Sequence, residues 1–449
     1  YFLDSAGPEP PIIDGNAPRV ERSLIWPFVS SARTGLLIVL SAAIMFGESN
    51  IRLRSIMSDQ VLNGIRVLDF GRYIAGPFCG TMLADFGAEV IRVEKLDGSE
   101  DRFVAPVGPN AGANFLSLGR NKKGLTLNPM KPEGQEVLKR LLPSVDVVIA
   151  NLPFPTLKAM QIDYDSLKAV KPDIILTMVS AFGIDGPYSE RVGFDTLGQA
   201  MSGAMYMTGD DVPRRASAPY VDFGTALFSA FGTMAALRER DKTGRGQLVE
   251  SSLFSTAMTF MNSQHIEQSV LQLDRPPQGN RGVTAAPVDC FKTSDGFIFV
   301  LAIGLPLFER WAKLVGAEEW IADPRFSTDE QRGDNADLIC DRMQQWCDGL
   351  TTSEALAGLA EARIPGGPVL NLQEALDDPH VNARGLHKYI DYPGVDKPSP
   401  LMDTPVRLST TPGGIRHRAP LLGEHTDELL AEVGYSDDDI ERLHNARVV

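Results

Sequence analysis

One carboxylate is distinguished by its surroundings in the sequence. Asp222 lies in the string Ala-Pro-Tyr-Val-Asp-Phe-Gly-Thr-Ala at positions 218–226, directly before a long run of small and apolar residues with helical spacing. This pattern predicts a helix N-terminus, where an aspartate caps free backbone N–H groups and is stabilised as the anion. The same geometry allows chemistry, because an ionised and exposed carboxylate can attack an acyl carbon. The pattern alone favours the capping role and leaves the chemical one open.

The composition limits the classes of partner. A chain of 449 residues that is 43% hydrophobic is long enough for one large domain or two ordinary ones. Its formal charge of −15 argues against nucleic acid or an anionic membrane as the main partner, so a phosphorylated ligand would need a local basic pocket. The four cysteines and six histidines show no metal-ligand spacing. We therefore expect no metal site and a cytoplasmic protein with reduced thiols.

The first 56 residues differ from the rest of the chain. Prolines crowd the opening, and the apolar run at 35–47 is shorter than the roughly 20 residues that span a bilayer. This run also lies too far from the first residue for a signal peptide. We expect the folded protein to begin at Met57, with residues 1–56 as a disordered extension outside it.

From Met57 onward, short β-branched runs alternate with helix-like stretches. This alternation predicts βαβ units and a parallel sheet covered on both faces, which is an α/β domain. The expected strands are 65–70, 89–95, 146–151 and 173–179, and the expected helices are 78–86, 132–142, 156–170, 222–241 and 248–271.

The pattern changes after residue 272. Residues 273–297 are rich in Pro, Gly and Arg and are typical of a linker. A strand at 297–303 and helices at 306–315 and 337–350 predict a smaller α+β region, and an amphipathic helical pattern follows at 421–443. We expect a large domain at 57–272, a linker with a small domain at 273–380, and a C-terminal segment at 381–449 that returns to the large domain.

Two nucleotide-binding motifs are missing. The glycines after the first strand are Gly71, Gly76 and Gly80, which do not form the G-x-G-x-x-G turn that approaches a pyrophosphate. The chain has no G-x-x-x-x-G-K-[ST] motif either. The first absence disfavours a nicotinamide enzyme, and the second excludes a P-loop NTPase.

Several strings together are far more specific than any one of them. They are GIRVLDF at 64–70, AGP at 75–77, LADFGAEVIRVE at 83–94, NKK at 121–123, RVGFD at 191–195, QAMSG at 199–203, KTGRGQ at 242–247 and APLLGEHTD at 419–427. This set resembles the class III CoA-transferase family, which also contains α-methylacyl-CoA racemases, over essentially all of residues 57–449. The resemblance implies a Rossmann-like large domain with a parallel sheet, a smaller α+β domain, and an interlocked homodimer.

The resemblance also implies a mechanism. The nucleophile of the transferases lies in the stretch matching 219–224, which makes Asp222 the expected catalytic residue. It would attack a donor acyl-CoA such as succinyl-CoA, pass through an aspartyl anhydride and an aspartyl-CoA thioester, and hand CoA to a carboxylic acid. We expect the backbone N–H groups of Phe223 and Gly224 to stabilise the oxyanion. Asp195 would either orient the acyl group or Asp222, or cap the helix that follows it.

By position, the CoA contacts of the family fall on a series of residues after the first strands. Met130 and Ala159 stand where lysine and arginine are usual, and a lysine is the neighbour of each. CoA or acyl-CoA is expected as substrate, with no permanently bound cofactor. For Lys122 and Lys123 a solvated turn and a phosphate contact are both open. The expected CoA-binding residues are Ile74, Ala75, Lys95, Leu127, Met130, Lys131, Asn151, Leu152, Lys158 and Ala159.

One position separates the two chemistries of the family. The racemases have a histidine immediately before the aspartate that matches Asp195, and Phe194, which occupies this position, cannot transfer a proton. The stretch 279–287 also has only two glycines, where other transferases have a glycine-rich loop. We therefore expect an acyl-CoA:carboxylate CoA-transferase. An α-methylacyl-CoA racemase and a non-catalytic CoA-binding protein are the alternatives.

Overall fold

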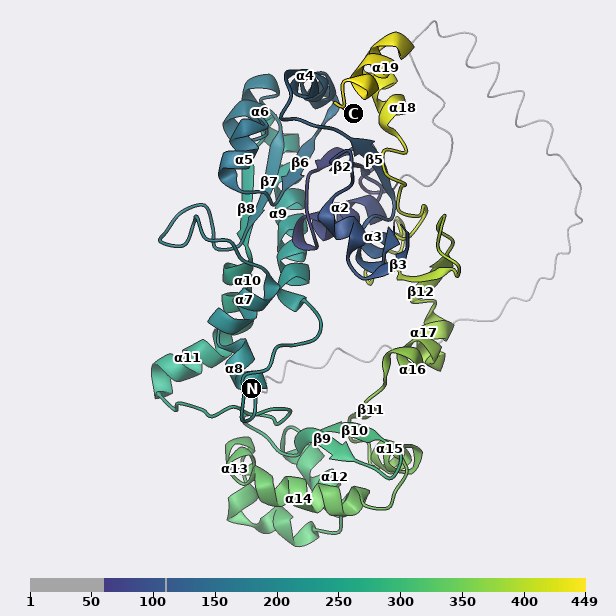
Figure 1. The fold of residues 1–449 in the computed structure, drawn as a ribbon. Helices are drawn as coiled ribbons and strands as arrows, with labels where there is room; N and C mark the ends of the chain where they lie inside the picture. The colour runs from purple at the N-terminus through teal and green to yellow at the C-terminus, as the bar shows by residue number, and fades with distance from the viewer. Residues whose placement is uncertain (1–59, 110) are drawn as a thin grey trace, which may run out of the picture. The chain divides into compact units, whose positions relative to one another are not determined.

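A parallel sheet organises the first half of the chain (Figure 1). The computed structural model describes residues 60–109 and 111–449, so the predicted extension at 1–56 lies outside the described residues. All neighbouring strands of the six-stranded sheet run parallel. Their order, read along the sheet, places the first strand in the middle, as in doubly wound nucleotide-binding folds. The strands in this order are β5 (Lys122–Thr126), β2 (Glu89–Glu94), β1 (Arg66–Asp69), β6 (Val147–Ala150), β7 (Ile175–Ser180) and β8 (Leu248–Ser252).

Helices cover both faces of this sheet because successive side chains of each strand point to opposite faces. Leu68 of β1 packs with the helices on one face, and its neighbour Val67 packs with those on the other. The fold is therefore a mixed α/β fold, as predicted. One face is covered by α4 (Pro132–Leu141), α5 (Phe154–Ala159) and α6 (Tyr164–Val170), and the other by α2 (Ala75–Asp85) and α9 (Tyr220–Thr243).

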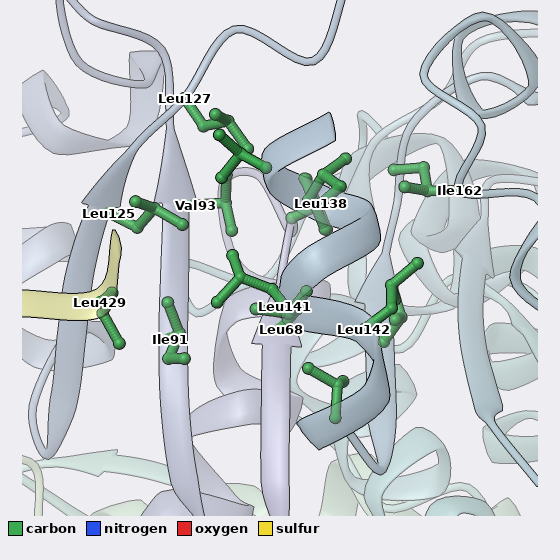
Figure 2. Packing of buried hydrophobic residues seen from close by; sticks show 14 of the residues in the cluster. Leu68, Ile91, Val93, Leu125, Leu127, Leu138, Leu141, Leu142, Ile162 and Leu429 are labelled. Carbon is green, nitrogen blue, oxygen red and sulfur yellow. The ribbon is translucent and has the colours of Figure 1, made fainter. Parts of the chain in front are cut away.

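Figure 2 shows the first of these faces from close by. Leu138 and Leu141 of α4 lie against Leu68 of β1 and Ile91 of β2. Leu429, from the C-terminal part of the chain, joins the same cluster. Each of these side chains is at most 3% exposed, which is the continuous burial expected of parallel strands.

Three predicted helices are wrong in detail. The stretch expected as one helix at 248–271 begins with β8, which pairs with β7, and continues as α10 (Leu253–Phe260) and α11 (Asn262–Leu271). The helix expected at 156–170 is broken between α5 and α6. The tail forms two helices, α18 (Thr426–Glu432) and α19 (Asp437–Asn445), because Gly434 has a positive φ between them.

Residues 286–364 have a hydrophobic core of their own, centred on Trp311. An antiparallel sheet of β11 (Gly366–Pro368), β10 (Phe297–Leu301) and β9 (Val288–Lys292) packs against helices here. This part of the chain therefore combines an antiparallel sheet with helices. The helices are α12 (Leu305–Leu314), α13 (Asp329–Asp334), α14 (Ala336–Cys347) and α15 (Thr352–Glu361).

The C-terminal part of the chain covers the open edge of the parallel sheet at β5. The amide of Thr126 donates to the hydroxyl of Thr426 (3.0 Å), and the amide of His425 donates to the carbonyl of Gly124 (2.9 Å). This coverage occupies an edge that would otherwise be open to pairing with another chain. The remaining elements are β3 (Pro106–Gly108), β4 (Ala111–Gly112), α3 (Ala113–Leu118), α7 (Asp195–Met201), α8 (Ala204–Thr208), α16 (Leu372–Asp377), α17 (Pro379–Arg384), β12 (His387–Ile390) and β13 (Ser399–Met402).

No helix within residues 60–109 and 111–449 is long and apolar enough to cross a membrane.

Candidate active site

Asp222 lies in the first turn of α9, three residues after the N-cap residue Pro219. Its side chain is 9% exposed, so the carboxylate is largely buried and not held out in solvent. The sequence had predicted an N-cap aspartate, exposed and ionised. The structure corrects this, because the helix begins earlier, at Tyr220, and its first turn packs against α2 and α10.

The buried position changes the acidity of Asp222. Burial, together with the nearby negative charge of Asp195, raises the pKa of Asp222 to about 7. No ion pair is found for its carboxylate in the described part of the chain that would offset the burial. Asp222 is therefore poised to change between the acid and the carboxylate near neutral pH, as active-site groups often are.

Asp195, the first residue of α7, binds the start of α9. One of its carboxylate oxygens accepts hydrogen bonds from the amides of Val221 (2.8 Å) and Asp222 (3.1 Å). The other accepts a hydrogen bond from the side chain of Gln199 (2.5 Å). Asp195 thus caps α9, which begins 25 residues later in the chain, and not the helix that directly follows it. This fixes the backbone that carries Asp222.

One of the two expected oxyanion donors is otherwise engaged. The amide of Phe223 donates to the carbonyl of Pro219 (3.1 Å), which is the first intrahelical bond of α9. Gly224 lies one residue deeper in the helix, where a Cβ would come within 2.4 Å of the Phe260 ring. The amide of Phe223 is therefore not free to stabilise an oxyanion in this structure, and for the amide of Gly224 that role stays a prediction. The role of Gly224 is close packing of α9 against α10.

The loop after β1 runs towards the start of α9. Asn151, which follows β6, accepts a hydrogen bond from the amide of Arg72 (2.6 Å) and donates one to its carbonyl (2.8 Å). Ile74 is the N-cap residue of α2, and Ala75 packs in one buried cluster with Val221. Ile74, Ala75 and Asn151, all expected near CoA, therefore shape a single loop that leads from the sheet to the neighbour of Asp222.

A buried ion pair at the end of β1 stabilises the start of this loop. Lys122 donates to Asp69 (2.8 Å) and to the carbonyl of Pro77 (2.6 Å), and the amide of Gly71 donates to Asp69 (2.8 Å). The charges of Lys122 and of Arg92 outweigh the effect of burial and hold the pKa of Asp69 below its usual value.

The interpretation of Lys122 and Lys123 as a solvated turn is wrong, because both lie in strand β5. Lys122 is buried inside the sheet and does not lie in a solvated turn. Lys123 forms ion pairs with Glu89 (2.9 Å) and Glu428 (2.8 Å) on the edge strand. Neither lysine lines the cavity at the carboxyl ends of the strands.

A cavity of about 470 Å³ opens at the carboxyl ends of the strands β1, β2, β5 and β6. Ligands of doubly wound folds bind at this edge of the sheet, beside the point where the strand order reverses. The volume of the cavity is within the usual range for a site that holds a small molecule or cofactor. Of the residues expected to contact CoA, the cavity wall contains Lys95, Leu127, Met130, Lys131 and Leu152.

Five of the ten expected CoA residues do not line the cavity, and two basic residues that were not predicted do. Of the five, Ile74, Ala75 and Asn151 shape the loop after β1. Lys158 and Ala159 lie exposed at the end of α5, next to the lining residue Met160. Arg72 and Arg447 line the cavity but were not predicted. Arg72 follows a predicted strand and could have been found from that position, whereas nothing in the sequence connects Arg447 with residues more than 300 positions earlier.

The basic side chains at the cavity have acidic neighbours. Arg72 and Lys95 both form ion pairs with Glu100. Burial alone would raise the pKa of Glu100, but the hydrogen bonds from these two cations lower it to about 2. The cavity therefore presents cations whose charge Glu100 partly neutralises.

The chemistry of the cysteines differs from that of Asp222. Burial raises the pKa of Cys79, Cys340 and Cys347 to about 12, so these thiols stay protonated at neutral pH.

Phe194, at the position of the racemase histidine, is 56% exposed. Its ring meets the ring of Tyr73 edge-on, with 5.4 Å between the ring centroids. Among residues 60–109 and 111–449, no group of three or more His, Cys, Asp and Glu side chains is placed to hold a metal ion.

The sequence model of CoA-transferase family III matches residues 62–426, which is most of the chain. The protein belongs to this family. It is 34% identical over 394 residues to a succinyl-CoA–D-citramalate CoA-transferase of Chloroflexus aurantiacus, covering 86% of this chain and 98% of that protein. A succinate–glutarate CoA-transferase of Agrobacterium fabrum is 33% identical over 83% of this chain and 95% of its own length.

The fold of this family III enzyme also resembles solved structures. A CAIB/BAIF family protein from Brucella suis superposes with a TM-score of 0.74 at 32% identity, over 84% of this chain and all of that one. The class of enzyme is thus a class III CoA-transferase, as the sequence motifs indicated.

Proposed function

We propose that this enzyme moves CoA from a donor thioester, such as succinyl-CoA, to a short dicarboxylic acid through covalent intermediates on Asp222. Similar proteins act on succinyl-CoA with citramalate, malate, mesaconate or glutarate, according to their names. These acids share a second carboxylate, which supports a dicarboxylate as the acceptor here.

The proposed reaction keeps the acyl and CoA groups in balance. A carboxylate oxygen of Asp222 attacks the thioester carbonyl, a C–O bond forms, and CoA leaves as the thiolate. The thiolate then attacks the aspartyl carbonyl, which releases the donor acid and leaves an aspartyl-CoA thioester. The acceptor carboxylate repeats these two exchanges in reverse, so no ATP is needed.

The observation that carries this proposal is the environment of Asp222. The carboxylate is buried at a capped helix start, lacks a cationic partner among the described residues, and has a pKa raised to about 7. Partial burial removes water that would stabilise the anion and hydrolyse an anhydride. The adjoining loop, through Arg72, reaches the cavity that we assign to CoA.

We further propose that two copies of the chain assemble as the interlocked homodimer of the family. The exposed side of α9 has large apolar side chains, among them Phe231, which is 76% exposed, and Leu227. Val270 of α11 is 71% exposed. Apolar surface of this kind is typical of an interface between subunits.

Covalent trapping tests the catalytic role. The enzyme is mixed with succinyl-CoA and hydroxylamine, and its peptides are analysed by mass spectrometry. We expect a hydroxamate on Asp222 that is absent in Asp222→Asn. It should persist in Asp241→Asn, which changes an exposed aspartate in the same helix.

The absence of a hydroxamate is the result that would contradict the proposal. A wild-type enzyme that binds CoA but gives no hydroxamate with several acyl-CoA donors would exclude the covalent route. Exchange of the α-hydrogen for deuterium in an α-methylacyl-CoA would then indicate a racemase, although Phe194 offers no proton-transfer group for it.

A further inference from the structure

The end of the chain forms one wall of the cavity beside the sheet. The amide of Asn128 donates to the carbonyl of Val448 (2.7 Å), and the ammonium group of Lys131 donates to the carbonyl of Ala446 (2.6 Å). These two bonds fix residues 446–448 against the turn that follows β5. Arg447, between the two acceptors, is one of the residues that line the cavity.

The backbone of Arg447 is held by the C-terminal turn of α19. Its amide donates to the carbonyl of His444 (2.8 Å), and the amide of Val448 donates to the carbonyl of Leu443 (2.9 Å). This pair of bonds is the Schellman motif, in which the residue after the C-cap has a positive φ and is usually glycine. Arg447 has φ 51°, so the chain places a long cationic side chain where glycine would be less strained. Side chains kept in such conformations are candidates for function.

The guanidinium of Arg447 is more available than the other cations at the cavity. Arg72 and Lys95 share Glu100, and Lys131 is bound to the carbonyl of Ala446. The side chain of Arg447 is 70% exposed, and its ion pair, with the highly exposed Asp97, is long at 3.5 Å. A fixed backbone with a weakly engaged guanidinium suits the binding of an anion that enters the cavity.

We infer that Arg447 binds a phosphate of the nucleotide end of CoA and so supplies charge that Met130 and Ala159 do not. This inference rests on the proposed function, because it takes CoA as the ligand of the cavity. The nucleotide end of CoA has a 3′-phosphate and a pyrophosphate, and the planar guanidinium can hold two phosphate oxygens at once. The apolar side chains of Leu127 and Leu152, which also line the cavity, suit the adenine ring.

The test is calorimetric titration with CoA, which needs no turnover. Arg447→Gly removes the cation and places at φ 51° the residue that this conformation favours, so we expect the thermal midpoint to stay equal or rise. We expect CoA binding to weaken about tenfold, the effect of losing one charge-assisted hydrogen bond. Arg447→Lys should give an intermediate loss. Arg442→Ala is the matched control, because Arg442 is an exposed arginine on α19 that pairs with Asp439 and does not line the cavity.

A second series assigns the phosphate. If Arg447→Gly weakens CoA but leaves 3′-dephospho-CoA unaffected, Arg447 contacts the 3′-phosphate, and an equal loss with both ligands assigns it to the pyrophosphate. Unchanged CoA binding by Arg447→Gly would overturn the inference, while the proposed function would still stand on the Asp222 hydroxamate. A wild-type enzyme that binds no CoA would overturn both.

Discussion

Two buried aspartates lie near opposite ends of the loop after β1, and they differ in their partners. Asp69 is fully buried and accepts hydrogen bonds from Lys122 and from the amide of Gly71. Asp222 is nearly as buried, and the charged group that affects its pKa is another aspartate, Asp195. The pKa of Asp69 is held below its usual value, whereas that of Asp222 is raised to about 7.

The two pKa values differ because the free-energy cost of burying the carboxylate is offset at Asp69 and not at Asp222. Removing a carboxylate from water favours its neutral form unless a cation or several donors compensate. Lys122 and Arg92 compensate at Asp69, so this group holds β1, β2 and β5 together as a permanent anion. At Asp222 the cost is not offset, which destabilises the folded anion and leaves a carboxyl group that titrates near neutral pH.

The largest effect is expected for Asp222→Asn, which should lower the transfer rate at least about a thousandfold, since it removes the proposed nucleophile. The same variant should be more stable than the wild type at high pH. Between the unfolded pKa near 3.8 and the folded pKa near 7, the native state binds more protons, so the wild-type protein loses stability as pH rises through this window. The shift corresponds to about 4 kcal/mol above pH 7.

Urea unfolding at pH 5 and at pH 8 measures how much the free energy of unfolding of Asp222→Asn exceeds that of the wild type. The stability advantage of Asp222→Asn should grow with pH, while Asp241→Asn should match the wild type at both values. An advantage that does not change with pH would mean that the burial of Asp222 does not raise its pKa.

Lys122→Met should have the next largest effect, and on stability alone. It leaves Asp69 buried with Arg92 as its nearest remaining cation, at 3.6 Å, and a broken buried pair typically costs about 3–5 kcal/mol. We expect the lower end of this range because Arg92 stays. The unfolding midpoint measures the loss, and Asp69→Leu in the same background should recover part of it by removing the unpaired charge. No recovery in this double variant would mean that the pair is not the source of the stability.

Asp195→Asn should have a smaller effect, on the pH dependence of activity. It removes the negative charge that helps to raise the pKa of Asp222, so the rising limb of the pH–activity profile should move to lower pH. Its amide oxygen can still accept from the amides of Val221 and Asp222. Asp195→Ala removes this cap as well and should cost about 1 kcal/mol more stability. A profile that shifts to higher pH would contradict the electrostatic role of Asp195.

Local patterns were enough to predict part of the fold. The strands at Arg66–Asp69, Glu89–Glu94 and Val147–Ala150 fall inside predicted runs, because short β-branched segments between turn residues define buried strands. The strand Leu248–Ser252 falls inside a stretch that the sequence predicts as helix, since five residues are too few to show which periodicity applies, and its pairing with β7 makes it a strand.

The site was less predictable because its decisive contacts are distant in the chain. Asp222 was found through the family motifs, but its burial and the cap from Asp195 depend on packing between α7 and α9. Arg447 lies near the turn after β5 only because the end of the chain is hydrogen-bonded to that turn. The two lysines of β5 illustrate the same limit, because adjacent and identical residues receive opposite environments from partners that the sequence does not reveal.

Lys123→Met should therefore have the smallest effect. The side chain of Lys123 is 28% exposed, and its ion pairs with Glu89 and Glu428 lie at the edge of the sheet, where water screens them. We expect a loss below about 1 kcal/mol that shrinks further in 1 M salt, against the salt-insensitive loss in Lys122→Met. Urea unfolding of both variants at low and high salt makes the comparison. Equal losses in the two would show that position in β5, and not the burial of the charge, determines what a lysine contributes there.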